Sequence, residues 1–376
     1  MSKSRKIDRR TFLARSAGVA GAAAAGFSAP DALAQGLQNV PPWMQTMGTP
    51  MRGYGKPSQF EAKVVRPTAT GYATVTPGAG ASRTPLESLE GTITPNGLHF
   101  ERHHNGVPDI DPAKHQLLIH GLVNRPLTFS VAALSRYPMV SRVYFVECAG
   151  NSRLNTQPPK PLQATAGAIH GLASCSEWTG VPLAMLLNEA GIAAGAQWLL
   201  AEGADAAAMS RSVPLAKALD DAMVALYQNG ERIRPEQGYP MRLLLPGWEG
   251  NMNVKWLRRI KVTNEPTHTK DETSKYSDLL PDGKSHQFTF EMGVKSVVTF
   301  PSFGHRLEGP GLYQISGIAW SAIFVRWAGV PGPASAFYRV LVAGVVLIPW
   351  LLARRATNKG DSHLFSRKKG TASSSR

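Results

Sequence analysis

Apolar and polar residues alternate in short runs from about residue 98 onward, and these runs are the clearest structural signal in the chain. Residues 115–121 (HQLLIHG) and 143–146 (VYFV) are rich in β-branched, aromatic and other apolar side chains. Such runs predict strands, and Met241–Leu245, which leads into a Pro-Gly turn, predicts another. We therefore expect short strands to dominate this part of the chain.

Helical spacing is rarer. Apolar residues recur at intervals typical of an amphipathic helix over Val181–Ala190, and Gly191 then supplies a C-cap. Pro214–Ala225 is a second helix candidate. The elements do not alternate in a βαβ rhythm, and no phosphate-binding loop occurs. The pattern predicts an α+β domain over residues 85–265.

Two segments flank this domain. Residues 35–84 are rich in Gly, Pro, Thr and Ser and show little periodicity, which predicts an extended N-terminal arm without a core. Residues 266–320 contain β-rich runs separated by turns, which predict strands of a β-sandwich. These runs are Gln287–Phe290, Val294–Phe300 and Gly311–Trp320.

The alternation stops after Ser321. Val340–Ala353 is an apolar run broken by Pro349, and a basic, serine-rich tail follows it. A helix that spans a membrane needs about 20 apolar residues, so this run is too short, although an interfacial or membrane anchor remains an alternative. We interpret residues 321–376 as an aberrant C-terminal segment.

The composition is that of a globular protein, with 43% apolar and 18% charged residues in a chain of 376 residues. The net charge of +15 is unusual, but it is unevenly spread. Residues 1–34 contribute +4 and residues 321–376 contribute +8, which leaves +3 for the body between them. A nucleic-acid-binding protein would have a basic face on its folded body, so we do not expect a nucleic-acid partner.

The basic N-terminus has the features of an export signal. Arg9-Arg10 precedes an apolar residue pair, an Ala- and Gly-rich stretch extends to Phe27, and Ala32-Leu33-Ala34 offers the small residues that a signal peptidase needs. A helix of the fold would instead need polar residues interleaved through this stretch. We interpret residues 1–34 as a twin-arginine signal peptide, which predicts a periplasmic protein and hints at a cofactor inserted before export.

The chain has two cysteines, Cys148 and Cys175, which are too few for a disulfide framework or a four-thiolate metal site. They form no Cys-x-x-Cys-His motif, so we do not expect this chain to bind covalent haem. Cys148 follows an apolar run and precedes Ala149-Gly150, where a thiolate at a strand end can meet a soft metal. On chemistry alone, a lone cysteine is more often a small buried hydrophobe.

Several motifs accompany Cys148 along the chain. They are Arg102-His103-His104, Glu147–Arg153 (ECAGNSR), Trp178–Leu183 (WTGVPL), Gly238–Arg242 (GYPMR) and Asn253–Leu257 (NVKWL). With these motifs the sequence resembles the sulfite oxidase family of molybdopterin enzymes, from about residue 98 to 320. The runs at residues 147–151 (ECAGN) and 247–251 (GWEGN) are most similar to those of the sulfane dehydrogenase molybdoproteins of periplasmic thiosulfate oxidation. Those proteins also have twin-arginine leaders.

The resemblance implies a role for each matching residue. Cys148 would be the thiolate ligand of molybdenum, and Arg102 and Arg153 would bind the anionic substrate. The residues that would bind or line the molybdopterin are His104, Arg242, Asn253, Lys255 and Trp256. Cationic side chains among them suit the anionic phosphate of the cofactor. Taken singly, each basic residue could instead be a solvated surface charge, and Trp178 and Trp256 could be core residues.

Two positions depart from the family pattern. His103 stands where the family's Arg-Asn-His motif has asparagine. In the family, a proton-donating tyrosine comes shortly before the segment that Ser212-Val213-Pro214 matches. Met209 stands at the position of that tyrosine in this chain. A thioether cannot donate a proton. Either Met209 lines a more apolar pocket, which suits a protein-bound sulfane sulfur, or the alignment slips in this loop.

The resemblance implies oxidation of a reduced sulfur species by oxygen-atom transfer, with the electrons passed to a partner c-type cytochrome. We favour sulfane sulfur on a carrier protein as the substrate. The alternatives are a sulfite dehydrogenase that reduces cytochrome c and an inactive, truncated or scaffold subunit.

The resemblance also implies an immunoglobulin-like dimerisation domain at the C-terminal end. Residues 266–320 match the opening half of that domain. Half a sandwich leaves sheet edges and an apolar face uncovered, which argues against a stable dimer.

Overall fold

The computed structural model describes residues 50–69, 78–156, 162–307 and 315–320, together with single positions at 44, 45, 47, 76, 158 and 309. The chain divides into two units, Met1–Glu61 and Ala62–Arg376. The described part of the first unit contains the short 3-10 helix η2 (Gln59–Glu61). The leader and the aberrant C-terminal segment lie outside the described residues, and both stay predictions.

The second unit contains a five-stranded sheet with the strand order β5-β4-β13-β8-β9. Its strands are β4 (Gln116–Gly121), β5 (Leu127–Ser130), β8 (Trp198–Gly203), β9 (Ser210–Pro214) and β13 (Leu257–Thr263). β4 and β13 are parallel, and the other pairs are antiparallel. In β4, Leu117 and Ile119 are buried and Gln116 is exposed, which confirms the strand predicted there.

A second five-stranded sheet has the order β11-β10-β7-β6, and β12 also pairs with β10. Its strands are β6 (Val140–Glu147), β7 (Ala173–Pro182), β10 (Met223–Gln228), β11 (Glu231–Arg232) and β12 (Arg242–Leu244). Gly180 allows β7 to approach β10, because a Cβ at this residue would lie 2.2 Å from the carbonyl oxygen of Val224. β6 ends directly before Cys148, as the apolar run predicted.

The described α-helices are short. They are α3 (Val131–Leu134), α4 (Ala166–His170), α5 (Leu183–Ala190), α6 (Leu215–Asp220) and α7 (Lys270–Ser274). α5 confirms the first predicted helix and ends at Gly191, whose φ of 72° favours glycine. The second prediction, Pro214–Ala225, is only partly correct, because pairing with β7 draws Met223–Ala225 into β10. Within the described ranges, no helix is long and apolar enough to cross a membrane.

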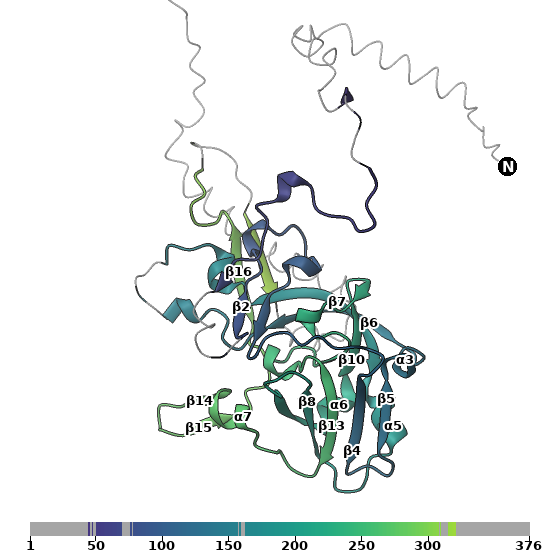
Figure 1. Cartoon of the computed structure of the whole chain (residues 1–376). Coiled ribbons are helices and arrows are strands. Elements are labelled where there is room, and N and C mark those ends of the chain that lie inside the picture. The colour runs from purple at the N-terminus through teal and green to yellow at the C-terminus, as the bar shows by residue number, and fades with distance from the viewer. Residues whose placement is uncertain are drawn as a thin grey trace, which may run out of the picture. The chain divides into compact units, whose positions relative to one another are not determined.

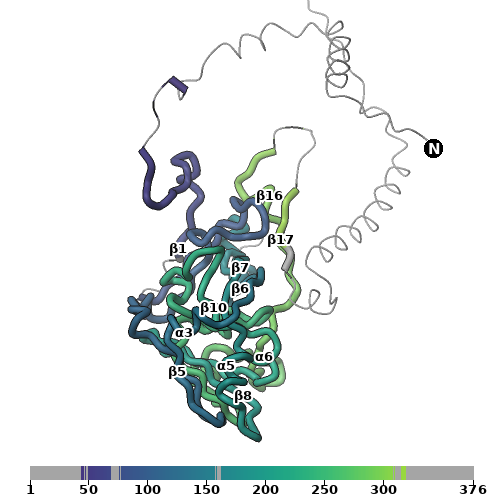
Figure 2. The backbone as a smooth tube through the Cα atoms, turned by 90° about the vertical axis from the view of Figure 1, so that its right-hand side faces the viewer, coloured from purple at the N-terminus to yellow at the C-terminus, as the bar shows by residue number. Residues whose placement is uncertain are grey.

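Helix α5 lies between the two large sheets. It contacts β4 of the first sheet and β7 and β10 of the second, and α6 packs beside it (Figure 1; Figure 2). The larger hydrophobic core fills this space and includes the fully buried Leu187 and Val224. A smaller core around Trp178 and Val146 lies where Cys148 packs, so the cysteine stands at the edge of a rigid apolar cluster.

A three-stranded antiparallel sheet precedes the large sheets. It consists of β1 (Thr68–Ala69), β2 (Gly80–Ser82) and β3 (Glu101–His103), with the 3-10 helices η4 (Leu86–Ser88) and η5 (Asn96–Leu98) between β2 and β3. The prediction that the arm builds no core is wrong for its last residues, because Ala81 and Ser82 are buried. Small residues have little strand propensity of their own, so pairing with β3 determines this strand.

After β13 the described residues form two separate two-stranded sheets. They contain β14 (Ser277–Leu279), β15 (Ser285–Gln287), β16 (Lys295–Phe300) and β17 (Ser316–Trp320). Two predicted strands correspond to β16 and β17. The third, Gln287–Phe290, is wrong beyond its first residue, because Phe288 and Phe290 pack against Trp198 instead. The immunoglobulin-like domain stays a prediction.

Candidate functional site

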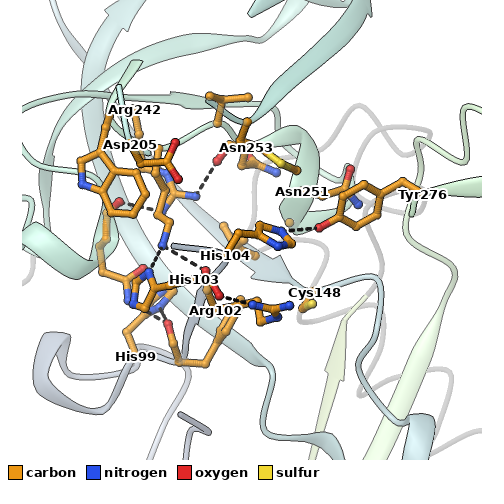
Figure 3. A pocket seen from close by; sticks show the side chains of 18 residues that line it. His99, Arg102, His103, His104, Cys148, Asp205, Arg242, Asn251, Asn253 and Tyr276 are labelled. Carbon is orange, nitrogen blue, oxygen red and sulfur yellow. Dashed lines mark hydrogen bonds between the residues drawn. The ribbon is translucent and has the colours of Figure 1, made fainter. Parts of the chain in front are cut away.

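A pocket that is partly open to solvent is formed by segments far apart in the sequence (Figure 3). Its walls come from β3, the residue after β6, the loop after β8, the segment between β12 and β13, and the residue before β14. Seven of the eight predicted site residues line this pocket: Arg102, His104, Cys148, Arg242, Asn253, Lys255 and Trp256.

Arg153, the remaining predicted site residue, does not line the pocket. The chain turns at Ser152, which has a positive φ of 65°, and Arg153 then begins the 3-10 helix η6 (Arg153–Thr156) with its side chain exposed. Its contact with a substrate therefore stays a prediction.

Hydrogen bonds fix the backbone of Cys148 on both sides. Its N–H donates to the carbonyl of Leu172 at 2.9 Å, and its carbonyl accepts from the N–H of Asn151 at 2.9 Å. Burial raises the pKa of the Cys148 thiol, against smaller opposing effects from the Gly150 N–H and the Arg102 charge. The thiol therefore keeps its proton, and a metal that binds here must displace it.

Arg102, His104 and Tyr276 lie near the thiol (Figure 3). The Nε2 atom of His104 and the hydroxyl of Tyr276 share a hydrogen bond of 3.0 Å, and their rings meet edge to face. Burial and the charge of Arg102 lower the pKa of His104 to about 4, so this ring is neutral at neutral pH. The thiol thus has one permanent cation and one neutral hydrogen-bonded pair as neighbours.

Lys255 connects β3 to the loops on the opposite wall. Its ammonium donates to the carbonyls of Arg102 and Glu236 at 3.2 and 3.0 Å and to Nδ1 of His103 at 2.8 Å. Because Nδ1 accepts, Nε2 of His103 has the proton and donates to Glu101 at 2.8 Å. Burial lowers the pKa of Lys255 to about 7, while the three acceptors favour its charged form.

Arg242 is a second buried cation of the pocket. Its Nη1 and Nη2 atoms donate to the carbonyls of Gln237 and Asn253, each at 3.0 Å, and its guanidinium lies 4.9 Å from the ring centroid of Trp178. Burial lowers the pKa of Arg242 to about 9, so it remains protonated at neutral pH. Within the described structure, neither Arg242 nor Lys255 forms a salt bridge with a carboxylate, so both can offer positive charge to an anionic ligand.

Asn253 and Trp256 shape the segment between β12 and β13. The Oδ1 atom of Asn253 accepts from the N–H of Leu245 at 2.7 Å, and its Nδ2 atom donates to the carbonyl of Trp248 at 3.2 Å. Trp256 adopts a left-handed φ of 53°, which is rare for an aromatic residue, and its Nε1 donates to the carbonyl of Pro235. Strained backbone of this kind concentrates at functional sites.

Known proteins and one protein family are similar to the part of the chain that forms the pocket. Residues 104–270 match the family of the oxidoreductase molybdopterin binding domain. The crystal structure of the sulfane dehydrogenase SoxCD from Paracoccus pantotrophus matches with a TM-score of 0.68 and 41% identity, covering 73% of this chain and 70% of that chain. The chain belongs to the sulfite oxidase family of molybdopterin oxidoreductases.

Two further relatives match this chain over part of their own length. Sulfite oxidase of Gallus gallus is 32% identical over 256 residues, which are 63% of this chain and 55% of that protein. NADH nitrate reductase of Ulva prolifera is 33% identical over 262 residues, which are 62% of this chain and 30% of that protein. The chain therefore spans about half of the sulfite oxidase and less than a third of the nitrate reductase.

The pocket fits the molybdopterin that this family binds. Four of its buried polar atoms have no hydrogen-bond partner in the described structure: Nε2 of His99, Oδ1 of Asp205, Nε of Arg242 and Oδ1 of Asn251. The Nδ1 atom of His99 contacts the carbonyl of Phe100, so Nε2 is an acceptor. Buried polar atoms without partners cost about 1–3 kcal/mol each. A polar pterin ring can supply both donors and acceptors, and its phosphate suits Arg242 and Lys255.

Sequence reasoning missed five residues that line the pocket: His99, Phe100, Asp205, Gln237 and Tyr276. The sequence around Asp205 could have indicated a pocket residue, because this carboxylate follows an apolar strand in a loop of small residues. Tyr276 gave none, since only the fold brings it to His104. Met209 also lines the pocket, as the predicted match to the Ser-Val-Pro segment implies.

We expect His99→Phe to make the protein less sensitive to acid. Burial lowers the pKa of His99 from 6.5 to about 3. Between these values the unfolded state binds a proton that the folded state excludes, so the free energy of unfolding falls as the pH drops through this window. The variant lacks this loss, and its ring can still stack on Phe100. Urea unfolding at a series of pH values measures the slope.

His286→Gln is the matched control, because His286 is exposed on β15 and should leave the slope unchanged. The explanation is wrong if His99→Phe and the wild-type protein lose stability equally between pH 6.5 and 4.

Proposed function

We propose that this chain is a periplasmic, molybdenum-dependent oxidoreductase that oxidises a reduced sulfur species. One arrangement supports this most strongly: a lone thiol at the edge of a pocket that also contains Arg102, buried cations and unpaired polar atoms. The thiol suits a soft metal, and the rest of the pocket suits an anionic pterin.

In this proposal each wall of the pocket has a separate task. Cys148, after losing its proton, binds the metal, while Arg242 and Lys255 provide positive charge for the pterin phosphate. When bound, the cofactor supplies oxygen-atom transfer and accepts two electrons from the substrate. Arg102 orients the anionic substrate, and the His104–Tyr276 pair can hold a proton beside it.

We infer that the substrate is sulfane sulfur held on a carrier protein. The solved structure that is 41% identical to this chain is a sulfane dehydrogenase. The thioether of Met209 makes its part of the wall apolar, which suits a protein-bound sulfur chain better than a small, strongly hydrated anion. Free sulfite is the second candidate, because the matching sulfite oxidases include those of Gallus gallus and Homo sapiens, at 32% and 31% identity.

Cys148→Ser tests whether this thiol holds the metal. A serine hydroxyl keeps the size of the side chain but does not ionise near neutral pH, so it replaces the thiolate ligand poorly. We expect sulfur oxidation to be lost, while the pterin, which Arg242 and Lys255 would hold, keeps molybdenum at about one atom per chain. Elemental analysis and turnover of purified protein measure both quantities.

Cys175→Ser is the matched control, because Cys175 lies in β7 and does not line the pocket. It should keep both metal and activity. Wild-type turnover in Cys148→Ser, or no molybdenum in mature wild-type protein from a host that makes the cofactor, would contradict the proposed function.

Two electron donors distinguish the substrates. With a c-type cytochrome as acceptor, we expect kcat/KM for a persulfidated carrier protein to exceed that for sulfite by at least about tenfold, because the apolar wall favours the bound sulfur chain. Stopped-flow reduction of the cytochrome measures both values. The reverse order would identify a sulfite dehydrogenase, and no turnover with either donor would identify an inactive subunit.

We infer the periplasmic location from the twin-arginine leader. Replacing Arg9 and Arg10 by lysine should leave the chain unprocessed in the cytoplasm, because this export route reads the arginine pair. The exported wild-type protein should begin near Gln35. Cell fractionation and mass spectrometry of the N-terminus measure both outcomes, and a processed periplasmic lysine variant would contradict the interpretation.

A further inference from the structure

Glu147 is the residue directly before Cys148, and its side chain is completely buried. Its Oε1 atom accepts a hydrogen bond from Nδ2 of Asn151 at 2.9 Å and lies 2.7 Å from Nζ of Lys295. Lys295 is the first residue of β16, 148 positions further along the chain. The ion pair therefore connects β6, which ends at Glu147, to the β16–β17 strand pair.

Packing alone does not explain a carboxylate at this place. A buried carboxylate loses its hydration at a cost of several kcal/mol unless a cation and hydrogen bonds replace it. A neutral amide would fill the same volume without that cost. The distinctive contribution of Glu147 is a negative charge, and Lys295 supplies the positive charge that balances it.

The charge at Glu147 lies close to the thiol. Glu147 is the last residue of β6 and is bonded directly to Cys148, and its carboxylate is completely buried. The loop is tightly packed, because a Cβ at Gly250 would lie 2.7 Å from the carbonyl oxygen of Glu147. Charges in such water-poor surroundings are screened less than charges at the surface. His170, whose pKa is lowered by burial and by Lys295, adds a neutral ring nearby.

We propose that Lys295 sets the electron affinity of the metal bound at Cys148 by balancing the charge of Glu147. Lys295 does not line the pocket and acts through Glu147, so it is a positioning residue. The proposal rests on the proposed function, because it needs molybdenum at Cys148. In this proposal β16 affects the midpoint potential of the metal, although none of its residues lines the pocket or belongs to a motif of the sequence analysis.

The sign of the effect follows from charge. Reduction adds an electron near Glu147, so a carboxylate whose charge Lys295 no longer offsets opposes reduction more strongly and lowers the midpoint potential of the metal. Lys295→Met should therefore lower the potential. Glu147→Gln leaves Lys295, which is 35% exposed, to be solvated, and should raise it. The double variant Lys295→Met/Glu147→Gln should return close to the wild-type value.

Redox titration of the loaded protein, followed by the EPR signal of the one-electron-reduced metal, measures these potentials. Lys295→Arg keeps the charge and should behave as the wild type does. Lys284→Met is the control for net charge, because it removes a lysine whose side chain is 81% exposed in the β14–β15 turn. An unchanged potential in Glu147→Gln or Lys295→Met, or an equal shift in Lys284→Met, would overturn the proposal.

A second measurement does not depend on the metal. In urea unfolding of cofactor-free protein, the two single variants and the double variant form a cycle, and we expect the double variant to lose less stability than the sum of the single losses. If the stability losses of the two single variants simply add up in the double variant, Glu147 and Lys295 do not stabilise each other and the proposal is wrong. Wild-type protein without molybdenum would instead count against the proposed function, while the unfolding cycle still tests the ion pair.

Discussion

The pocket depends on three hydrogen bonds from one buried ammonium. Lys255 joins the backbone of β3 to the loop at Glu236 and to the ring of His103, so it holds two walls of the pocket at a fixed separation. This connection needs the neutral tautomer of His103 with its proton on Nε2, and Glu101 selects that tautomer by accepting the proton's hydrogen bond. Histidine can reach both partners at once because its two nitrogens face opposite ways.

The sequence identified those parts of the site that lie in local motifs. Cys148, Arg102 and the Asn253–Trp256 segment all line the pocket, and each stands in a short run with a recognisable pattern. Tyr276 reaches the pocket only through the packing of the segment after β13, which no local pattern encodes. Arg153 shows the opposite case. It is close to Cys148 in the sequence, but the chain turns at Ser152 and Arg153 does not line the pocket.

The same contrast applies to the fold. The α5 helix and β4 have a strong period of their own, and both were predicted. β2 consists of Gly, Ala and Ser and becomes a strand because β3 offers it a partner. The start of β10 has helical spacing yet pairs with β7 and β12. Where tertiary pairing and local preference disagree, the pairing determines the structure.

The parallel pairing of β4 with β13 has a consequence for the order of synthesis. β4 is complete at Gly121, but its central neighbour β13 ends at Thr263, and β13 also separates β4 from β8. The first large sheet therefore cannot be completed until the chain has been synthesised as far as Thr263. Pairings between strands so far apart in the sequence also form slowly. The pocket segment just before β13 is equally late. Cofactor insertion must follow translation of this unit rather than accompany it.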